Sequence, residues 1–395
     1  MEHSDKRRRL RLNALAIAVS LMGMAPLAAS AFEAREVEVC PSSAKVYDPE
    51  FDIGSQQMAY FDGRDGLRVA RVLADGRIDS TNCGGTLVSR GVTISLPELP
   101  FKAGPEWALS ARGLELYFTK LDRDGRGYMA RSLYDGSWRN ARIDESQDRG
   151  LALVSNDATD PEPRLVYVRT DNAGGYELAW REAGRPETEA LLPGRVDPRT
   201  GGAPRWVPGR RALSYALPDD NGTLQAVLYD VDTGVVEVLT RDAGNKDEVW
   251  LWHAPEFGGG LALMTVVDGC CLRFYRQVNG EWRQRREIKA SEFSRRPAIF
   301  SPEPFVHDGR SFVAMQLARE RVSDSEIWMV ELIENGLPPT QLSDPQRRGV
   351  NRTEPEWMAT PEGVFVYVSA SSGSSRFALN RLSTPLSVSA PQRAP

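Results

Sequence analysis

The sequence has few of the residues that usually build catalytic or metal centres. It holds three histidines and four cysteines in 395 residues, and only His253 and His307 lie beyond the N-terminal segment. It has no Gly-x-Ser-x-Gly element, no phosphate-binding glycine-rich loop and no Cys/His cluster. These absences exclude an α/β-hydrolase domain, a P-loop nucleotide site and a structural zinc site.

Basic runs are missing from the sequence except near its start. Residues 1–31 have a basic beginning, an apolar run broken by Gly23 and Pro26, and the small-x-small site Ala29-Ser30-Ala31. This pattern predicts a signal peptide cleaved after Ala31. A membrane anchor is the alternative, but the apolar run is short for a span. Sec and twin-arginine export both remain open, and either gives a periplasmic or secreted protein with no membrane span after cleavage.

The predicted mature chain is acidic. The net charge of −5 becomes about −8 when residues 1–31, with five basic and two acidic residues, are removed. No basic stripe with interleaved aromatics occurs, so nucleic acid is not expected as a partner. A chain of this length exceeds an ordinary single core unless the fold is built from repeated units.

Export would place the four cysteines in an oxidising compartment. Cys40 and Cys83 are the expected disulfide pair. Cys270 and Cys271 are adjacent. On a strand they would point to opposite faces, with one thiol buried and one exposed, whereas a vicinal disulfide would stiffen the turn at this place. Both readings stay open.

A short phrase of Pro-Glu-aromatic recurs along the chain. It reads DPEF, GPEW, APEF and EPEW, and these copies lead through turn residues into a β-rich run. APRW and PAIF are two weaker copies of the same motif. Proline lacks an N–H and suits the first residue of a strand. The aromatic residue should pack on the neighbouring unit while the glutamate points the other way. The phrase therefore predicts the entry to an innermost strand.

The repeat interval is about 51 residues once a weaker unit near residue 150 is included. Apolar positions alternate in twos, helical patterns are nearly absent, and Asp-Gly turns recur between the predicted strands. Such periods are typical of a β-propeller. We expect an all-β protein with seven blades, starting near residues 49, 105, 150, 204, 255, 297 and 355, and six blades if the unit near 150 is only an elaboration.

Residues 224–240 and 325–343 each match a third strand, a turn and a fourth strand of a blade. Together with the repeated phrases, they resemble the blade repeats of TolB-like propellers, also called WD40-like repeats in the TolB sense. The resemblance covers most of the mature chain. It implies an envelope-located binding propeller. The N-terminal domain of TolB has no counterpart here, so a TolB-type docking role does not transfer.

Ring closure should use both ends of the chain. Residues 35–40 alternate as a strand does and can supply the fourth strand of the last blade, which removes an exposed edge. The expected organisation is a signal peptide at 1–31, a propeller at 32–385 and a loose tail at 386–395. We expect a monomer.

The candidate ligand-binding residues lie at the inner strands. They are the glutamates of the repeated phrase, the arginine at the same position in APRW and the histidine just before APEF. These residues are Glu50, Glu106, Arg205, His253, Glu256 and Glu356. Converging carboxylates can bind a cation such as Ca²⁺ or act as an acid/base pair on a sugar. They can equally accept backbone or arginine hydrogen bonds that serve the blade. The half EF-hand pattern at 121–127 lacks its final acidic residue and is read as a hairpin.

Two functions follow from these residues. The first is a non-catalytic, exported propeller that binds an envelope protein or a glycan. The alternative is a hydrolase or lyase acting on a carbohydrate or peptide at the channel mouth, with His253 and Glu256 as catalytic residues. The regular repeat and the absence of a singular catalytic constellation favour the first.

Overall fold

The computed structural model describes the chain in stretches: 32–41, 46–64, 66–79, 83–96, 103–144, 149–157, 160–170, 176–194, 203–320, 324–333, 336–372 and 377–387. The chain separates into two units, Met1–Glu33 and Ala34–Pro395, and the description below concerns the second. The predicted signal peptide lies outside the described residues. No helix in the described stretches is long and apolar enough to cross a membrane.

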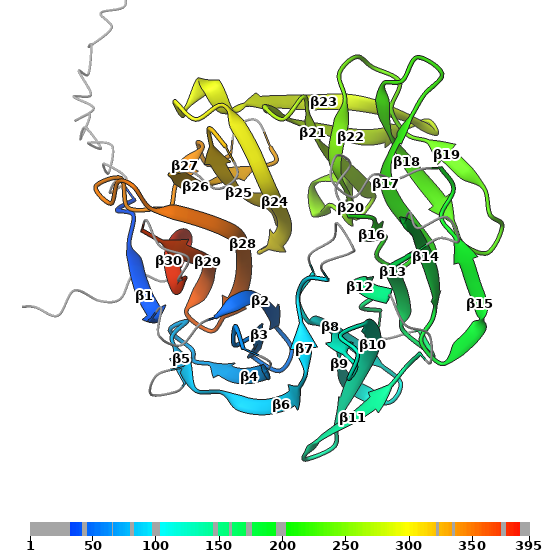
Figure 1. The fold of residues 1–395 in the computed structure, drawn as a ribbon. Coiled ribbons are helices and arrows are strands. Elements are labelled where there is room, and N and C mark those ends of the chain that lie inside the picture. Colours follow the sequence, from blue (N-terminus) through cyan, green and yellow to red (C-terminus); the bar gives the residue numbers. More distant parts are fainter. Residues whose placement is uncertain are drawn as a thin grey trace, which may run out of the picture. The chain divides into compact units, whose positions relative to one another are not determined.

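Seven antiparallel sheets follow one another around a ring (Figure 1). The first three are blade 1, with β2 (Tyr47–Asp52), β3 (Gln57–Phe61), β4 (Gly66–Val72), β5 (Ile78–Asp79) and β6 (Thr86–Arg90); blade 2, with β7 (Val92–Thr93), β8 (Glu106–Ser110), β9 (Gly113–Leu121), β10 (Gly127–Tyr134) and β11 (Trp138–Arg142); and blade 3, with β12 (Arg149–Val154), β13 (Arg164–Thr170), β14 (Tyr176–Glu182) and β15 (Arg185–Leu191).

The other four sheets have four strands each. They are blade 4, with β16 (Arg205–Trp206), β17 (Ala212–Pro218), β18 (Leu224–Asp230) and β19 (Val236–Val238); blade 5, with β20 (Lys246–His253), β21 (Leu261–Val267), β22 (Cys271–Val278) and β23 (Glu281–Lys289); blade 6, with β24 (Ala298–His307), β25 (Arg310–Ala318), β26 (Ser325–Glu331) and β27 (Thr340–Gln341); and blade 7, with β28 (Asn351–Thr360), β29 (Gly363–Ser371), β30 (Ala378–Ser387) and β1 (Glu36–Cys40).

The inner strands close the ring. Contacts run from β2 to β8, β12, β16, β20, β24 and β28, and from β28 back to β2. The fold is therefore an all-β, seven-bladed propeller, as the repeat predicts. The weak unit near residue 150 is a complete blade, β12 to β15, so the six-bladed alternative is wrong.

The core lies between blades as well as within them. Every residue of β29 is buried, because this strand has a neighbouring blade on each face. Apolar clusters join adjacent sheets; one contains Met264 and Phe274 of blade 5 with Val313 and Met315 of blade 6. Packing of blade on blade therefore stabilises the ring.

Tight turns join many of the strands, as the Asp-Gly pairs predict. At Asp268-Gly269 and Asp308-Gly309 both residues have positive φ, which identifies type I′ turns. The 121–127 segment is a hairpin turn between β9 and β10, and the Asp122 carboxylate accepts the backbone N–H of Arg126.

The N-terminal strand completes blade 7. β1 pairs with β30 in antiparallel register, as predicted. The Glu36 side chain is fully buried, and its carboxylate accepts hydrogen bonds from Arg352 at 2.8–3.1 Å and from Asn380 at 2.6 Å. The predicted disulfide is also present: Cys40 of β1 is bonded to Cys83, between β5 and β6 of blade 1.

Two boundaries differ from the prediction. In blade 5 the inner strand is β20, which precedes APEF, and Pro255–Phe257 forms the short 3₁₀ turn η2 after it. Proline permits both positions, because it suits the first turn of a helix as well as a strand start. At the C-terminus β30 extends to Ser387, two residues into the expected tail, and 388–395 lie outside the described residues.

Candidate ligand-binding site in the central channel

A backbone bulge recurs on four inner strands. Register shifts separate Tyr47 from Glu50, Asp247 from Trp250, Phe300 from Glu303 and Thr353 from Glu356. Within each bulge one residue other than glycine has φ between 43° and 53°, namely Asp48, Glu248, Ser301 and Glu354. A bulge re-aims the side chains of its strand and is frequent beside functional sites.

The aromatic residues of DPEF, GPEW and EPEW pack against the preceding blade, as predicted, whereas Phe257 of APEF lies in η2 after its inner strand. The Phe51 ring lies 4.5 Å from that of Tyr367 in blade 7, and the Trp357 ring lies 5.0 Å from that of Phe305 in blade 6. The Trp107 indole N–H donates to the Glu50 carbonyl oxygen at 3.0 Å. Because successive side chains on a strand point in opposite directions, the glutamate before each of these aromatic residues points to the inside of the ring.

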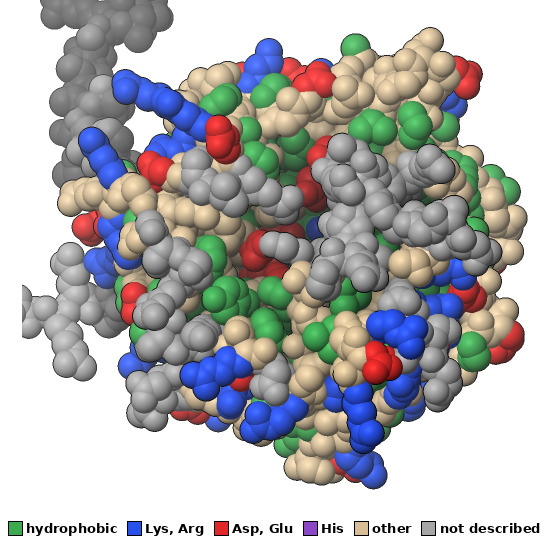
Figure 2. All heavy atoms as spheres, in the orientation of Figure 1, with side chains coloured by type: hydrophobic (Ala, Val, Ile, Leu, Met, Phe, Trp, Pro, Cys, Tyr) green, Lys and Arg blue, Asp and Glu red, His purple; other side chains and the backbone are tan. Residues whose placement is uncertain are grey.

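Four glutamates from four blades share this interior. Glu50, Glu106, Glu303 and Glu356, here called the channel glutamates, interact electrostatically with one another, and Asp48 adds a further carboxylate. Gly104 permits this approach, because a side chain there would meet the Asp48 carboxylate at 2.8 Å. Figure 2 shows acidic side chains in the hollow at the middle of the ring.

The channel glutamates resist ionisation. Burial raises the pKa of Glu106 to about 8, to which Asp48 and Glu303 contribute and which Arg205 opposes. Burial likewise raises the pKa of Glu303 to about 8. Burial, then repulsion from Glu356, holds the pKa of Glu50 well above its ordinary range. These side chains keep partial solvent contact, so the channel can exchange protons and ligands with water.

Arg205 is the cation among these carboxylates. Its guanidinium lies 3.9 Å from a carboxylate oxygen of Glu248 and 4.3 Å from the centre of the Trp250 ring. It also interacts with Glu303 and Glu106. Among the described residues, one arginine thus faces several carboxylates, which leaves an excess of potential negative charge, and such a site attracts cations.

Three of the predicted glutamates, Glu50, Glu106 and Glu356, therefore lie together with Arg205, whereas Glu256 does not join them. The Glu256 carboxylate accepts hydrogen bonds from the backbone and the hydroxyl of Ser311 in β25, the latter at 2.8 Å. It follows the inner strand of blade 5 and joins that blade to blade 6. The repeat predicts Glu256 at the channel position of blade 5, but Trp250 occupies that position, directly after the bulge of β20.

His253 also lies away from the channel glutamates. It ends β20, three residues after Trp250, which is roughly 10 Å along a strand. Its ring nitrogens face the carbonyl oxygens of Gly259 at 2.8 Å and Pro208 at 3.2 Å. In the alternative function, His253 and Glu256 are the catalytic pair. In the structure, the His253 ring contacts carbonyl oxygens of two loops, and the Glu256 carboxylate is bonded to Ser311 of blade 6. His307 ends β24, beside Asp308.

Glu303 and Glu248 were missed by the sequence analysis. Residues 301–303 read Ser-Pro-Glu and match Asp-Pro-Glu and Glu-Pro-Glu in the other blades, but the expected aromatic is replaced by Pro304. Spacing carries a signal: Trp250, Glu303 and Glu356 are each separated by 53 residues. The bulges of blades 1, 6 and 7 share a Pro-Glu pair after the residue of positive φ, and this pair, not the aromatic, would have identified Glu303.

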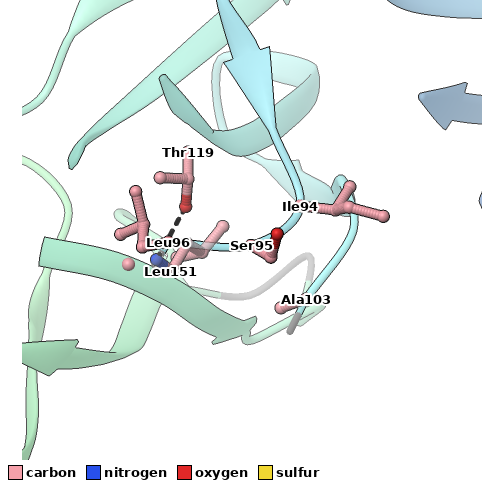
Figure 3. Close-up of a pocket in the computed structure, with 7 residues that line it drawn as sticks. Ile94, Ser95, Leu96, Ala103, Thr119 and Leu151 are labelled. Carbon is pink, nitrogen blue, oxygen red and sulfur yellow. Dashed lines mark hydrogen bonds between the residues drawn. The ribbon is translucent and has the colours of Figure 1, made fainter. Parts of the chain in front are cut away.

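Ready-made metal coordination is absent from the described residues: no group of three or more His, Cys, Asp or Glu side chains there could hold a metal ion. A separate small hollow lies between blades 2 and 3, where Thr119 accepts the Leu151 N–H at 2.9 Å (Figure 3). The described residues that line it have no ionisable side chain; they are Ile94, Ser95, Leu96, Ala103, Thr119, Gly150 and Leu151.

No protein-family model and no curated protein matches this sequence. Solved structures match by fold. An oligogalacturonate lyase in complex with manganese aligns with a TM-score of 0.56 and 12% identity, over 90% of this chain and 94% of that one. The BP39L lectin from Burkholderia pseudomallei aligns with a TM-score of 0.51 and 15% identity, over 88% of this chain and 99% of that one.

TolB proteins are also among the similar structures. A putative TolB from Agrobacterium tumefaciens aligns with a TM-score of 0.39 and 12% identity, over 85% of this chain and 90% of that one. The matches above 0.5 show the propeller fold, which is the architecture that the resemblance to TolB-like repeats implied. Likeness at these identities shows no shared activity, so function must be argued from the site.

Proposed function

We propose that this protein is an exported, non-catalytic propeller that binds a protein or ligand in the bacterial envelope, in the periplasm or after secretion, through a cationic group that enters the central channel. The observation that supports it is the convergence of the channel glutamates from four blades near Arg205. A bound cation would favour the charged form of these carboxyls, which burial, and then repulsion between carboxylates, keeps protonated. The Cys40–Cys83 disulfide is consistent with export.

The cation can be a lysine or arginine side chain of a partner, or Ca²⁺. A basic peptide segment fits the arrangement best, because the carboxylates come from different blades and no described group of three acidic side chains forms a metal cage. An aromatic face is available beside them at Trp250, which already stacks on Arg205. A partner cation could share that face.

Thermal-shift measurements test this function. The probes are an oligolysine peptide, CaCl₂, a neutral oligosaccharide and an acidic oligosaccharide, each at pH 6 and pH 8. We expect a cationic probe to raise Tm, and more strongly at pH 8, because binding must displace protons from the channel glutamates. A ligand at 100 times its Kd stabilises by about 2.7 kcal/mol.

Matched variants assign the site. Glu50→Gln and Glu356→Gln should lose the shift, while Glu281→Gln, at an exposed position on β23, should keep it. A rise of Tm with the acidic or neutral sugar alone would contradict the proposal. If the wild type cleaved a carbohydrate or peptide and the His253→Ala variant did not, the result would instead support the hydrolase or lyase alternative.

A further inference from the structure

The two thiols outside the structural disulfide touch each other. The Cys270 and Cys271 sulfurs lie 2.6 Å apart, while both residues are half-buried and so remain reachable from solvent. A disulfide bond is about 2.05 Å long. The expectation that one thiol is buried and the other exposed on opposite faces of a strand is wrong. Cys270 belongs to the turn and only Cys271 to β22, so the alternation of a strand does not separate them.

The backbone holds this pair in place from several sides. The type I′ turn at Asp268-Gly269 precedes it, and the Cys270 N–H donates to the Val267 carbonyl at 3.1 Å. The Cys270 carbonyl accepts the Ala290 N–H at 3.1 Å. The backbone of the pair is therefore held by a hydrogen-bonded turn, which keeps the two side chains next to each other.

We propose that Cys270 and Cys271 form a reversible redox site, which is oxidised to a vicinal disulfide by a protein or small-molecule disulfide of the export compartment. This site is independent of the binding function proposed for the channel. The balance is two thiols and one oxidant disulfide giving the Cys270–Cys271 disulfide and two thiols of the reduced oxidant.

The order of attack follows from the two environments. Burial, then the hydrogen bond and charge of Cys270, raises the pKa of the Cys271 thiol to about 12. Cys271 is therefore the poorer first nucleophile, so the first attack is assigned to Cys270, whose sulfur bonds to one sulfur of the oxidant and displaces the other as a thiolate. In the mixed disulfide Cys270 carries no charge, so two causes of the raised pKa vanish. Cys271 then loses its proton, attacks the Cys270 sulfur and releases the second thiolate.

Strain makes the bond reversible. Neighbouring α-carbons are about 3.8 Å apart, below the usual range of about 4.4–6.8 Å for disulfides. A strained disulfide is reduced more easily than a structural one. Cys40 and Cys83, with α-carbons 5.5 Å apart, fall inside that range and serve as the internal comparison.

The site adjoins a channel strand. The Gly269 carbonyl, in the same turn, accepts the Ile299 N–H at 2.8 Å. Ile299 lies in β24, four residues before the channel glutamate Glu303. Oxidation would stiffen the turn that anchors this strand, so the amide of Ile299 should exchange hydrogen more slowly in the oxidised protein.

Redox titration of the mature protein tests the proposal. The protein is equilibrated with mixtures of oxidised and reduced glutathione, alkylated with N-ethylmaleimide and analysed by peptide mass. We expect the 270–271 peptide to change in one step from two labels to none, with loss of two hydrogens, under conditions in which Cys40–Cys83 stays oxidised. Cys270→Ser and Cys271→Ser should each leave one thiol that takes glutathione. Two labels at every mixture, or two glutathiones on one wild-type peptide, would overturn it.

Discussion

The channel glutamates titrate as a coupled group, because each carboxylate lies in the field of the others. Their raised pKa values mean that the folded protein binds protons that the unfolded chain has already released at neutral pH. Stability is then highest below the ordinary glutamate pKa and falls as pH rises towards about 8. Partial solvent contact weakens the effect without changing its sign.

Replacing Glu303 with glutamine should flatten this pH dependence. The variant should match the wild type at pH 5, where the carboxyl is protonated, and should have a higher Tm at pH 8, where the wild type carries the charge. Melting curves between pH 5 and 8 measure the difference. Glu281→Gln is the control and should follow the wild type; parallel curves for Glu303→Gln and wild type would show that burial is not perturbing this carboxyl.

Ser301 tests the backbone of the repeated bulge. It has φ of 43° on β24, two residues before Glu303. A β-branched residue tolerates this conformation poorly, so Ser301→Val should lower the free energy of unfolding by about 1–2 kcal/mol. Ser301→Gly should be nearly neutral, since glycine adopts positive φ freely. Urea unfolding measures both, and equal losses in the two variants would point to the lost hydroxyl instead of the backbone.

At the scale of the strand, β1 depends on a buried ion pair. Glu36 and Arg352 are both almost completely buried, and the pair joins the N-terminal strand to the inner strand of blade 7. Arg347 lies 3.3 Å from the same carboxylate. The pair selects one register for β1, because a shift by one residue would turn Glu36 to the opposite face of the sheet.

Breaking this pair should loosen the closing strand. Glu36→Gln leaves Arg352 buried without its counter-charge, a change that typically destabilises by about 3–5 kcal/mol. Hydrogen exchange should show early opening of β1, with a lower Tm for the whole domain. Glu38→Gln, at an exposed position on the same strand, should change neither. A wild-type Tm for Glu36→Gln would mean that the Asn380 hydrogen bond is sufficient.

At the scale of the molecule, the ring is closed twice. The hydrogen bonds of β1 to β30 close blade 7, and the Cys40–Cys83 disulfide then ties β1 to blade 1. The strand pairing lies within blade 7, whereas the disulfide crosses the junction between the first and last blades. Opening of the ring at this junction would expose the channel, so closure also preserves the arrangement of the glutamates.

Removal of the disulfide should therefore lower the free energy of unfolding. Its loop spans 43 residues, and loss of such a link destabilises a folded chain by about 2–5 kcal/mol. The Cys40→Ser, Cys83→Ser double variant should melt at a lower temperature and lose the cation-dependent shift when β1 detaches. Reduction of the wild type with dithiothreitol gives the matched comparison, and an unchanged Tm in both would show that strand pairing alone holds the junction.

The propeller was predictable because its signals are local. Alternating apolar positions, proline at strand starts and Asp-Gly turns each act within a few residues, and their repetition near 51 residues predicts seven blades and a closing N-terminal strand. The Cys40–Cys83 pair was predicted from the expected export and the small number of cysteines. Amino-acid order thus determined the architecture of this protein by itself.

Which side chains meet was decided by tertiary structure. Glu303 joins the channel and Glu256 does not, although Glu256 stands in the better copy of the phrase, because Glu303 follows the bulge of β24 whereas Glu256 lies in η2, after the end of β20. The contact between the Cys270 and Cys271 sulfurs likewise depends on where the turn ends and the strand begins. A shift of one residue is small in sequence, but it moves a side chain to the other face of a sheet.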